Sequence, residues 1–147
     1  MHTNLTPDKI SIIIYDHHFD KVHYALVMAA AAAAINKSVT LFFTMGASQA
    51  LLKEGPNALA AWPKMPLSDD EGSGLERDKS YKNKGVAQFE ELLQACETLG
   101  VRFMVCEMGL QAKSIKNNPL RTDLSIEISG VVTFLNDASS SGIVVFI

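Results

Sequence analysis

The amino-acid sequence predicts an α/β fold, a three-layer sandwich in which helices cover a mainly parallel central sheet. Short apolar runs without polar alternation, such as KISIIIY at residues 9–15, are typical of strands buried on both faces. Segments of helical composition separate these runs. Strands that alternate with helices form parallel sheets, because right-handed crossovers return the chain in the same direction.

The individual elements follow from local composition. Buried strands are expected over residues 9–15, 38–44, 101–106 and 142–147, and the segment 125–128 is either a further strand or a connection. Helices are expected over 21–36 and 86–99 and from about residue 129, with short ones after residues 45 and 107. Asp20 is placed to cap the start of the first helix, and Gly100 to end the helix over 86–99.

Length and composition indicate one compact domain over residues 1–147. The chain has 147 residues, of which 48% are hydrophobic and 20% charged, enough for a single core but not for two. Within it, the segment at about 54–85 is rich in proline, glycine and charge, so we expect a long irregular insertion there. Insertions of that length in small domains are usually functional or mobile.

Charge and hydropathy exclude several classes of protein. A net charge of −3 provides no broad cationic surface, so nucleic acid is not an expected partner. The most apolar stretch, residues 22–35, is shorter than the roughly 20 residues that a membrane span needs. No secretory signal is recognisable, which predicts a cytoplasmic protein whose two cysteines are reduced thiols rather than a disulfide.

The two cysteines call for different interpretations. Cys106 ends the apolar run VRFMVC, at the carboxyl edge of the predicted sheet, where ligands and chemistry collect in folds of this kind. There it is either a small core side chain or a reactive thiol, whose pKa a following helix would lower and the adjacent Glu107 would raise. Cys96 lies on the apolar stripe of its helix and is expected to be structural.

Other candidate cleft residues follow the same edge. Asp16, His17 and His18 come directly after the first strand, and their side chains either orient a substrate and move protons or belong to a solvated loop. The remaining candidates are Met45 and Gly46 after the second strand, and Glu107 and Met108 after the third. Neither a nucleotide-binding fingerprint nor the ligand spacing of a metal site is present, so no cofactor and no metal are expected.

Taken in order, several segments resemble the DsrE/DsrF-like family, in particular its sulfurtransferase-like or peroxiredoxin-like branch. These segments are FDKVHYALVMAAAAA, SVTLFFTMGASQALLK, MPLS, FEELLQACETLGVRFMVCEM and IEISGVVTFLNDASSSGIVVFI. The resemblance implies a flavodoxin-like fold, assembly into trimers or hexamers, and a cysteine that carries persulfide sulfur between partner proteins. The cysteine of VCEM matches that motif, so Cys106 inherits the role and Cys96 does not.

Two functional hypotheses follow. The leading one is a cytoplasmic sulfur carrier or sulfurtransferase-like protein that holds persulfide sulfur on Cys106, exchanges it with donor and acceptor proteins, and forms a homo-oligomer. The alternative is a non-catalytic oligomeric binding or scaffold module of the same fold, in which Cys106 is unreactive. A nucleotide- or flavin-binding domain is a weaker third hypothesis, because it rests on fold analogy alone.

Overall fold

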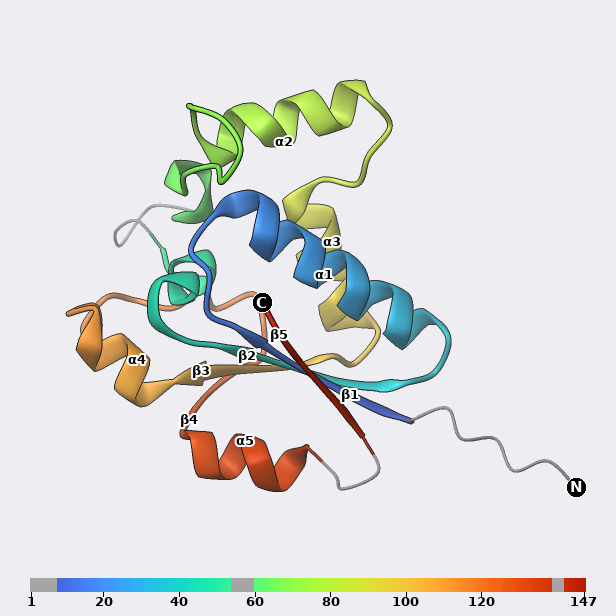
Figure 1. Ribbon diagram of the computed structural model, residues 1–147, viewed down its shortest axis with the longest axis vertical. Helices are drawn as coiled ribbons and strands as arrows, with labels where there is room; N and C mark the ends of the chain where they lie inside the picture. Colours follow the sequence, from blue (N-terminus) through green and yellow to red (C-terminus); the bar gives the residue numbers. More distant parts are fainter. Residues whose placement is uncertain (1–7, 54–59, 139–141) are drawn as a thin grey trace, which may run out of the picture.

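A computed structural model describes residues 8–53, 60–138 and 142–147 of the chain. Its centre is a five-stranded, wholly parallel sheet in the order β4-β3-β2-β1-β5 (Figure 1). The strands are β1 (Lys9–Ile14), β2 (Ser38–Phe43), β3 (Arg102–Cys106), β4 (Ile126–Ser129) and β5 (Ile143–Phe146). The predicted α/β sandwich is therefore confirmed, and the segment left open between strand and connection is a strand.

Helices cover the two faces of the sheet unequally. The helices α1 (Phe19–Ala34) and α3 (Phe89–Thr98) pack on one face, and α5 (Val131–Asp137) lies alone on the other (Figure 1). The topology explains this, because the chain moves from β1 to β2 and β3 in one direction but crosses back from β4 to β5 in the other. Right-handed crossovers in opposite directions place their helices on opposite faces.

Short helices occupy the connections at the carboxyl edge of the sheet. They are the 3-10 helices η1 (Met45–Leu51) and η2 (Trp62–Lys64) and the α-helix α4 (Glu107–Ala112). None of the helices within the described ranges combines the length and apolar character needed to cross a bilayer.

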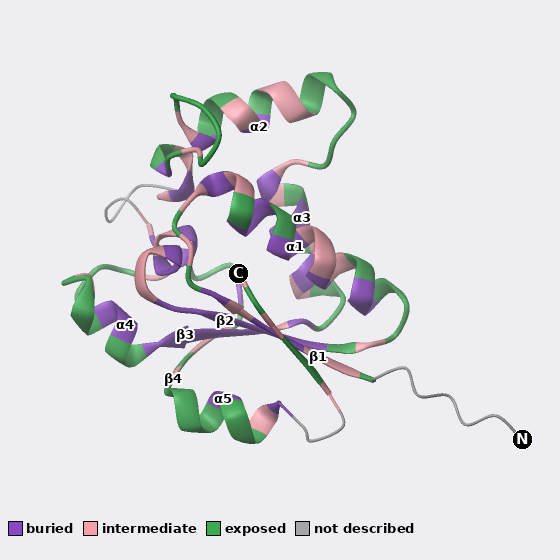
Figure 2. Cartoon of the chain, viewed as in Figure 1, coloured by how far each residue is buried: buried purple, intermediate pink, exposed green. Residues whose placement is uncertain are grey.

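The core is divided by the sheet into a large and a small cluster. The large cluster joins the sheet to α1 and α3 and contains the fully buried Ile12, Leu41, Phe89 and Phe103. The small cluster, under α5, consists of Phe42, Met104, Cys106 and Phe134, with Ile13 at its margin. Figure 2 shows the corresponding contrast between the buried side of α1 and the mostly exposed surface of α5.

The region expected to be an irregular insertion at about 54–85 contains a regular helix, α2 (Gly74–Asn83), so that expectation was wrong for this part of it. Residues 54–59 of the expected insertion lie outside the described residues. The helix and the segment before it are each anchored by a hydrogen bond. The buried carboxylate of Asp78 accepts a hydrogen bond from the backbone N–H of Phe89 at 2.7 Å, and the N–H of Phe19 donates to the carbonyl of Pro66 at 2.8 Å.

Asp20 does not cap α1 as the sequence predicts, because the helix begins one residue before it, at Phe19. Its carboxylate instead accepts hydrogen bonds from the backbone N–H of Ser68, at 2.8 Å, and from the Ser68 hydroxyl. Burial alone would raise the pKa of Asp20, but the bonds from Ser68 outweigh it and lower the pKa below its ordinary value. The acidic side chain thus ties the segment before α2 to the start of α1.

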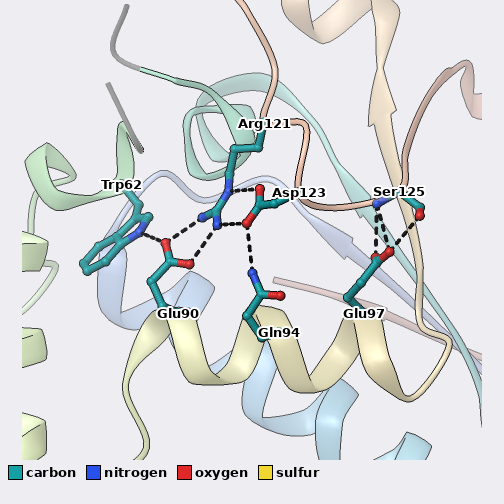
Figure 3. A network of polar contacts seen from close by, with 7 residues as sticks. All are labelled: Trp62, Glu90, Gln94, Glu97, Arg121, Asp123 and Ser125. Carbon is teal, nitrogen blue, oxygen red and sulfur yellow. Dashed lines mark hydrogen bonds and ion pairs between the residues drawn. The ribbon is translucent and has the colours of Figure 1, made fainter. Parts of the chain in front are cut away.

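The polar face of α3 holds the connection between α4 and β4 in place (Figure 3). The network consists of Trp62, Glu90, Gln94, Glu97, Arg121, Asp123 and Ser125. The guanidinium of Arg121 is almost fully buried and donates to the carboxylates of Glu90 and Asp123, each at 2.6 Å. A buried guanidinium needs such partners, so this network fixes the loop against the helix.

Candidate functional site at the carboxyl edge of the sheet

The candidate site lies where β1, β2 and β3 end side by side. The three strands are neighbours and parallel, so the segments that follow them, beginning at Tyr15, Thr44 and Glu107, meet at one edge of the sheet. This brings the sequence-predicted candidates of all three segments to the same edge. In parallel α/β sheets this edge is the usual place for ligands and chemistry.

Cys106 is the last residue of β3 and the N-cap of α4. Its Sγ accepts a hydrogen bond from the backbone N–H of Gly109 at 3.4 Å. The side chain packs among Phe42, Met104 and Phe134, and only 1% of the residue is exposed. The burial is explained by α5, whose Phe134 covers this end of the strand, and whether the thiol is reactive stays a prediction.

Close backbone packing joins the segments after the three strands. A Cβ atom at Gly46 would lie 2.6 Å from the Cβ of His17, and one at Gly109 would lie 2.6 Å from the backbone nitrogen of Met45. Neither glycine therefore tolerates a side chain without movement of its neighbour. Met45 itself has a positive φ of 49°, which is uncommon for a residue with a side chain. The edge is built so that α4 approaches the start of η1 directly.

The candidates after β1 form a compact polar group. One carboxylate oxygen of Asp16 accepts hydrogen bonds from the backbone N–H of His18, at 2.8 Å, and from its ring Nδ1, at 2.6 Å. Burial alone would raise the pKa of Asp16, but these bonds lower it below its ordinary value. The rings of His17 and His18 lie 4.2 Å apart, and donor atoms of the three residues gather within 4.8 Å, close enough to hold one metal ion.

The candidates after β3 face outward. Glu107 is exposed and its carboxylate lies 3.3 Å from the ammonium of Lys116, while Met108 is 58% exposed. Glu107 thus forms an ion pair with Lys116. Although it directly follows Cys106, none of the described hydrogen bonds joins its carboxylate to the sulfur. These two side chains belong to the surface around the site, whereas Cys106 lies beneath it.

Cys96 lies in the large cluster, fully buried between α3 and α1. Its Sγ is 3.9 Å from the carbonyl oxygen of Leu26, and burial raises the pKa of its thiol to about 12. A thiol with such a pKa is almost entirely protonated at neutral pH and is a poor nucleophile. His23 is also in the core, where its Nε2 contacts the carbonyl oxygen of Ala87 at 2.8 Å. We therefore interpret His23 as a structural residue and not as part of the candidate site.

Sequence reasoning missed two features of the edge. Gly109, the donor to Cys106, was not singled out, although a glycine three residues after the cysteine is the signal of a close backbone approach. The lysines around a hollow beside η1 were also missed, because Lys53, Lys64 and Lys113 are widely spaced in the sequence. Only the fold brings them together.

The fold and the edge define a class of small α/β proteins with a wholly parallel sheet and a cysteine at the end of its third strand. The sequence model of the DsrE/DsrF-like family matches residues 8–146. The chain belongs to the DsrE/DsrF-like family, and the resemblance seen in the sequence is confirmed.

Individual relatives agree with this assignment. The chain is 26% identical to the uncharacterized protein YrkE of Bacillus subtilis, with 95% of this chain and 96% of the relative covered. It is 27% identical to the sulfur carrier protein DsrE2 of Allochromatium vinosum, with 95% and 98% covered. The crystal structure of the ychN protein from E. coli matches with a TM-score of 0.61 at 17% identity, covering 95% of this chain and 98% of that one, which shows the shared fold.

Proposed function

We propose that the protein carries sulfur as a persulfide on Cys106. Family membership and the relative named as a sulfur carrier support a role in sulfur transfer. The observation that carries the assignment to Cys106 is its place at the end of β3, with the sulfur accepting the N–H of Gly109. A backbone N–H directed at sulfur stabilises a negative charge there, which both thiolate and persulfide anions bear.

The proposed reaction has two displacements at sulfur. The thiolate of Cys106 attacks the outer sulfur of a donor persulfide R–S–SH, forms a new S–S bond and releases the donor as the thiolate R–S⁻. An acceptor thiolate then attacks the outer sulfur of Cys106–S–SH and releases the Cys106 thiolate. The outer sulfur keeps its oxidation state, so the cycle needs no redox cofactor. His17 and His18 lie at the same edge and are proposed to assist proton movement.

We infer a homo-oligomer, a trimer or hexamer, located in the cytoplasm. Exposed apolar side chains on the edge strand β5 support subunit contacts, among them Val144 and Phe146. Two free cysteines suit a reducing compartment. Donor and acceptor proteins are the proposed partners, because the sulfur must enter and leave through other thiols.

A second candidate function is a binding or scaffold module of the same fold. The near-complete burial of Cys106 favours it, because a thiol that no partner can reach transfers no sulfur. The carrier function therefore requires that the cover of Cys106 opens. The two candidates differ in whether Cys106 reacts in the folded protein.

The deciding experiment is intact-mass analysis after exposure to glutathione persulfide, with the added sulfur mapped to each cysteine. We expect one added sulfur atom on Cys106, complete loss of loading in Cys106→Ser, and normal loading in the matched control Cys96→Ser. Sulfur mapped to Cys96, or to neither cysteine under conditions that load a known carrier, would contradict the proposal that Cys106 carries sulfur. Either result would favour the binding or scaffold module.

A further inference from the structure

The loop between β1 and α1 carries Asp16, His17 and His18 at consecutive positions, and we call these three residues the histidine cluster. One carboxylate oxygen and one ring nitrogen from each histidine lie within 4.8 Å of one another. Donor atoms around a tetrahedral metal ion are about 3.3 Å apart when each bond is about 2.0–2.1 Å long. Small rotations of the side chains would therefore bring all three donor atoms onto one ion.

Contacts with other segments hold the backbone of the histidine cluster in place. The N–H of Asp16 donates to the backbone oxygen of Ile147 at 3.2 Å, and His18 is the N-cap of α1. Between these two residues, His17 lies against Gly46, where an added Cβ would be only 2.6 Å from the His17 Cβ. Residues whose backbone is fixed in advance lose less entropy when they bind a ligand.

The side chains of the histidine cluster supply one negative charge and two nitrogen donors. The carboxylate of Asp16 is ionised at neutral pH, and it shares a proton with Nδ1 of His18 at 2.6 Å. A metal ion between these two atoms takes the place of that proton, and the His18 ring then carries its proton on Nε2. His17 is exposed, and within the described residues no hydrogen bond engages its ring nitrogens.

We propose that the histidine cluster binds one divalent transition-metal ion of the Zn²⁺ class, through the carboxylate of Asp16 and one ring nitrogen each of His17 and His18. Imidazole and carboxylate donors suit such ions, whereas Mg²⁺ and Ca²⁺ prefer oxygen donors alone. The side chains of Asp16 and His18 are 34% and 29% exposed, so solvent reaches the ion. Three protein ligands leave a fourth position open to water, as in catalytic rather than structural zinc sites.

The proposed metal site does not include the thiol of Cys106. In the sheet, β2 lies between β1 and β3, which places the ends of the two outer strands about 10 Å apart. Cys106 also packs into the small cluster under α5. A bound ion occupies ring nitrogens of His17 and His18, so these histidines cannot move protons for sulfur transfer while it is present. The metal site and the carrier function are therefore separate proposals.

This proposal departs from the expectation that no metal is bound, which rested on ligand spacing along the chain. In an extended strand, consecutive side chains point to opposite faces, which would separate His17 from His18. The loop after β1 instead brings their rings to 4.2 Å between centroids. The conformation of the loop, rather than the spacing, gathers the ligands.

The test is isothermal titration of the tag-free, full-length protein with ZnCl₂. We expect one Zn²⁺ per chain, and we expect His17→Ala, His18→Ala and Asp16→Asn each to lower the association constant at least about tenfold. Asp70→Asn is the matched control, since Asp70 also accepts a backbone N–H, from Glu71 at 2.8 Å, but has no histidine beside it. It should change the constant less than about twofold. Mg²⁺ should bind at least about 100-fold more weakly than Zn²⁺.

Nitrogen NMR of the histidine rings locates the ion. Zn²⁺ should shift the ring signals of His17 and His18 and leave those of the buried His23 unchanged. Cys106→Ser should bind Zn²⁺ as the wild type does, because the thiol is not a ligand. A zinc-induced shift at His23 without one at His17 and His18 would contradict the proposed site.

Three further results would overturn the proposal: no Zn²⁺ binding by the folded wild-type protein, unchanged binding by the His17→Ala, His18→Ala double variant, or an equal loss in Asp70→Asn. Loss of binding in Cys106→Ser would also overturn it, as would Mg²⁺ that binds as tightly as Zn²⁺. Persulfide loading of Cys106 is measured without added metal. Failure of this proposal is therefore distinguishable from failure of the sulfur-carrier proposal.

Discussion

The two faces of the sheet are buried by very different amounts of protein. On one face, α1 and α3 enclose a continuous core, whereas on the other α5 is a helix of seven residues with one fully buried side chain, Phe134. The rest of α5 is largely solvent-exposed, including Val132 at 73% (Figure 2). The sheet therefore has one face that carries the stability of the fold and one that is thinly covered.

This difference separates two cysteines that exposure alone does not distinguish. Cys96 and Cys106 are both almost completely buried. To uncover Cys96, α3 must leave α1, which breaks the large core. To uncover Cys106, only the contact between α5 and the sheet must open. Local opening costs less than global unfolding where few apolar contacts hold an element, so burial at Cys106 is compatible with intermittent reactivity.

The largest expected effect is in thiol alkylation of the native protein. With iodoacetamide at pH 8, Cys106 should react at least about 100-fold faster than Cys96, because Cys96 has both the deeper cover and the raised pKa of about 12. A thiol with that pKa is roughly one ten-thousandth ionised at pH 8. Mass spectrometry of the two cysteine peptides over time measures both rates.

The same experiment has an internal control in denaturant. In concentrated urea both cysteines should react at similar rates, since unfolding exposes both thiols to solvent. Equal rates in the native protein, or a slower Cys106, would remove the proposed difference between the two faces and with it the route by which sulfur reaches Cys106.

The second prediction compares one aromatic side chain from each face. Phe89→Ala should lower the free energy of unfolding by about 3–5 kcal/mol, as expected for a large cavity in a well-packed core. Phe134→Ala should lower it by only about 1–2 kcal/mol, because α5 can loosen without unfolding the rest. Urea denaturation measures both values. Phe134 stacks on Phe42 with ring centroids 4.8 Å apart, so its removal also uncovers the small cluster.

Labelling distinguishes this interpretation from a uniform loss of stability. Phe134→Ala should speed the alkylation of Cys106 about tenfold or more and leave Cys96 nearly unchanged. If Phe134→Ala costs as much stability as Phe89→Ala and accelerates both cysteines equally, α5 is part of the same cooperative unit as α1 and α3.

Much of the fold was predictable because it depends on local pattern. The strands over 9–15 and 101–106 are apolar runs, and the Ala-rich segment before Asn36 is helical by composition, so their type follows from short windows of sequence. The helix α2 was missed because its sequence, GLERDKSYKN, has little apolar periodicity. It is held by tertiary contacts, such as the bond from Phe89 to the buried Asp78, which no local window contains.

The sequence predicted where the candidate site lies, but not that α5 would bury Cys106. Parallel strands end at one edge, so the gathering of His17, Gly46 and Cys106 at that edge follows from the order of elements. The burial of Cys106 depends on which face α5 covers. That in turn depends on β5 pairing with β1 rather than β4, a choice that composition does not determine.

The smallest expected effect concerns the carboxylate that fastens α5 to the sheet. Asp137 accepts hydrogen bonds from Thr40 and Arg102, each at 2.6 Å, and lies 2.9 Å from the ammonium of Lys9. Burial alone would raise the pKa of Asp137, but these partners outweigh it and lower the pKa below 3.8. A lowered pKa in the folded state stabilises the fold above pH 3.8, and this stabilisation is lost as the pH falls through the lowered value.

Asp137→Asn should therefore lower the free energy of unfolding by about 1 kcal/mol at pH 7, and the difference from wild type should shrink below pH 3.8. Urea denaturation between pH 7 and pH 3 measures it. Because Asp137 fastens α5, the variant should also speed the alkylation of Cys106 at pH 7 by about fivefold, the factor that 1 kcal/mol represents. The exposed pair of Asp69 and Arg77 lies away from α5, so Asp69→Asn should leave the labelling of Cys106 unchanged. A gain in Cys106 labelling by Asp69→Asn equal to that of Asp137→Asn would show that general charge, rather than the fastening of α5, controls access to the thiol.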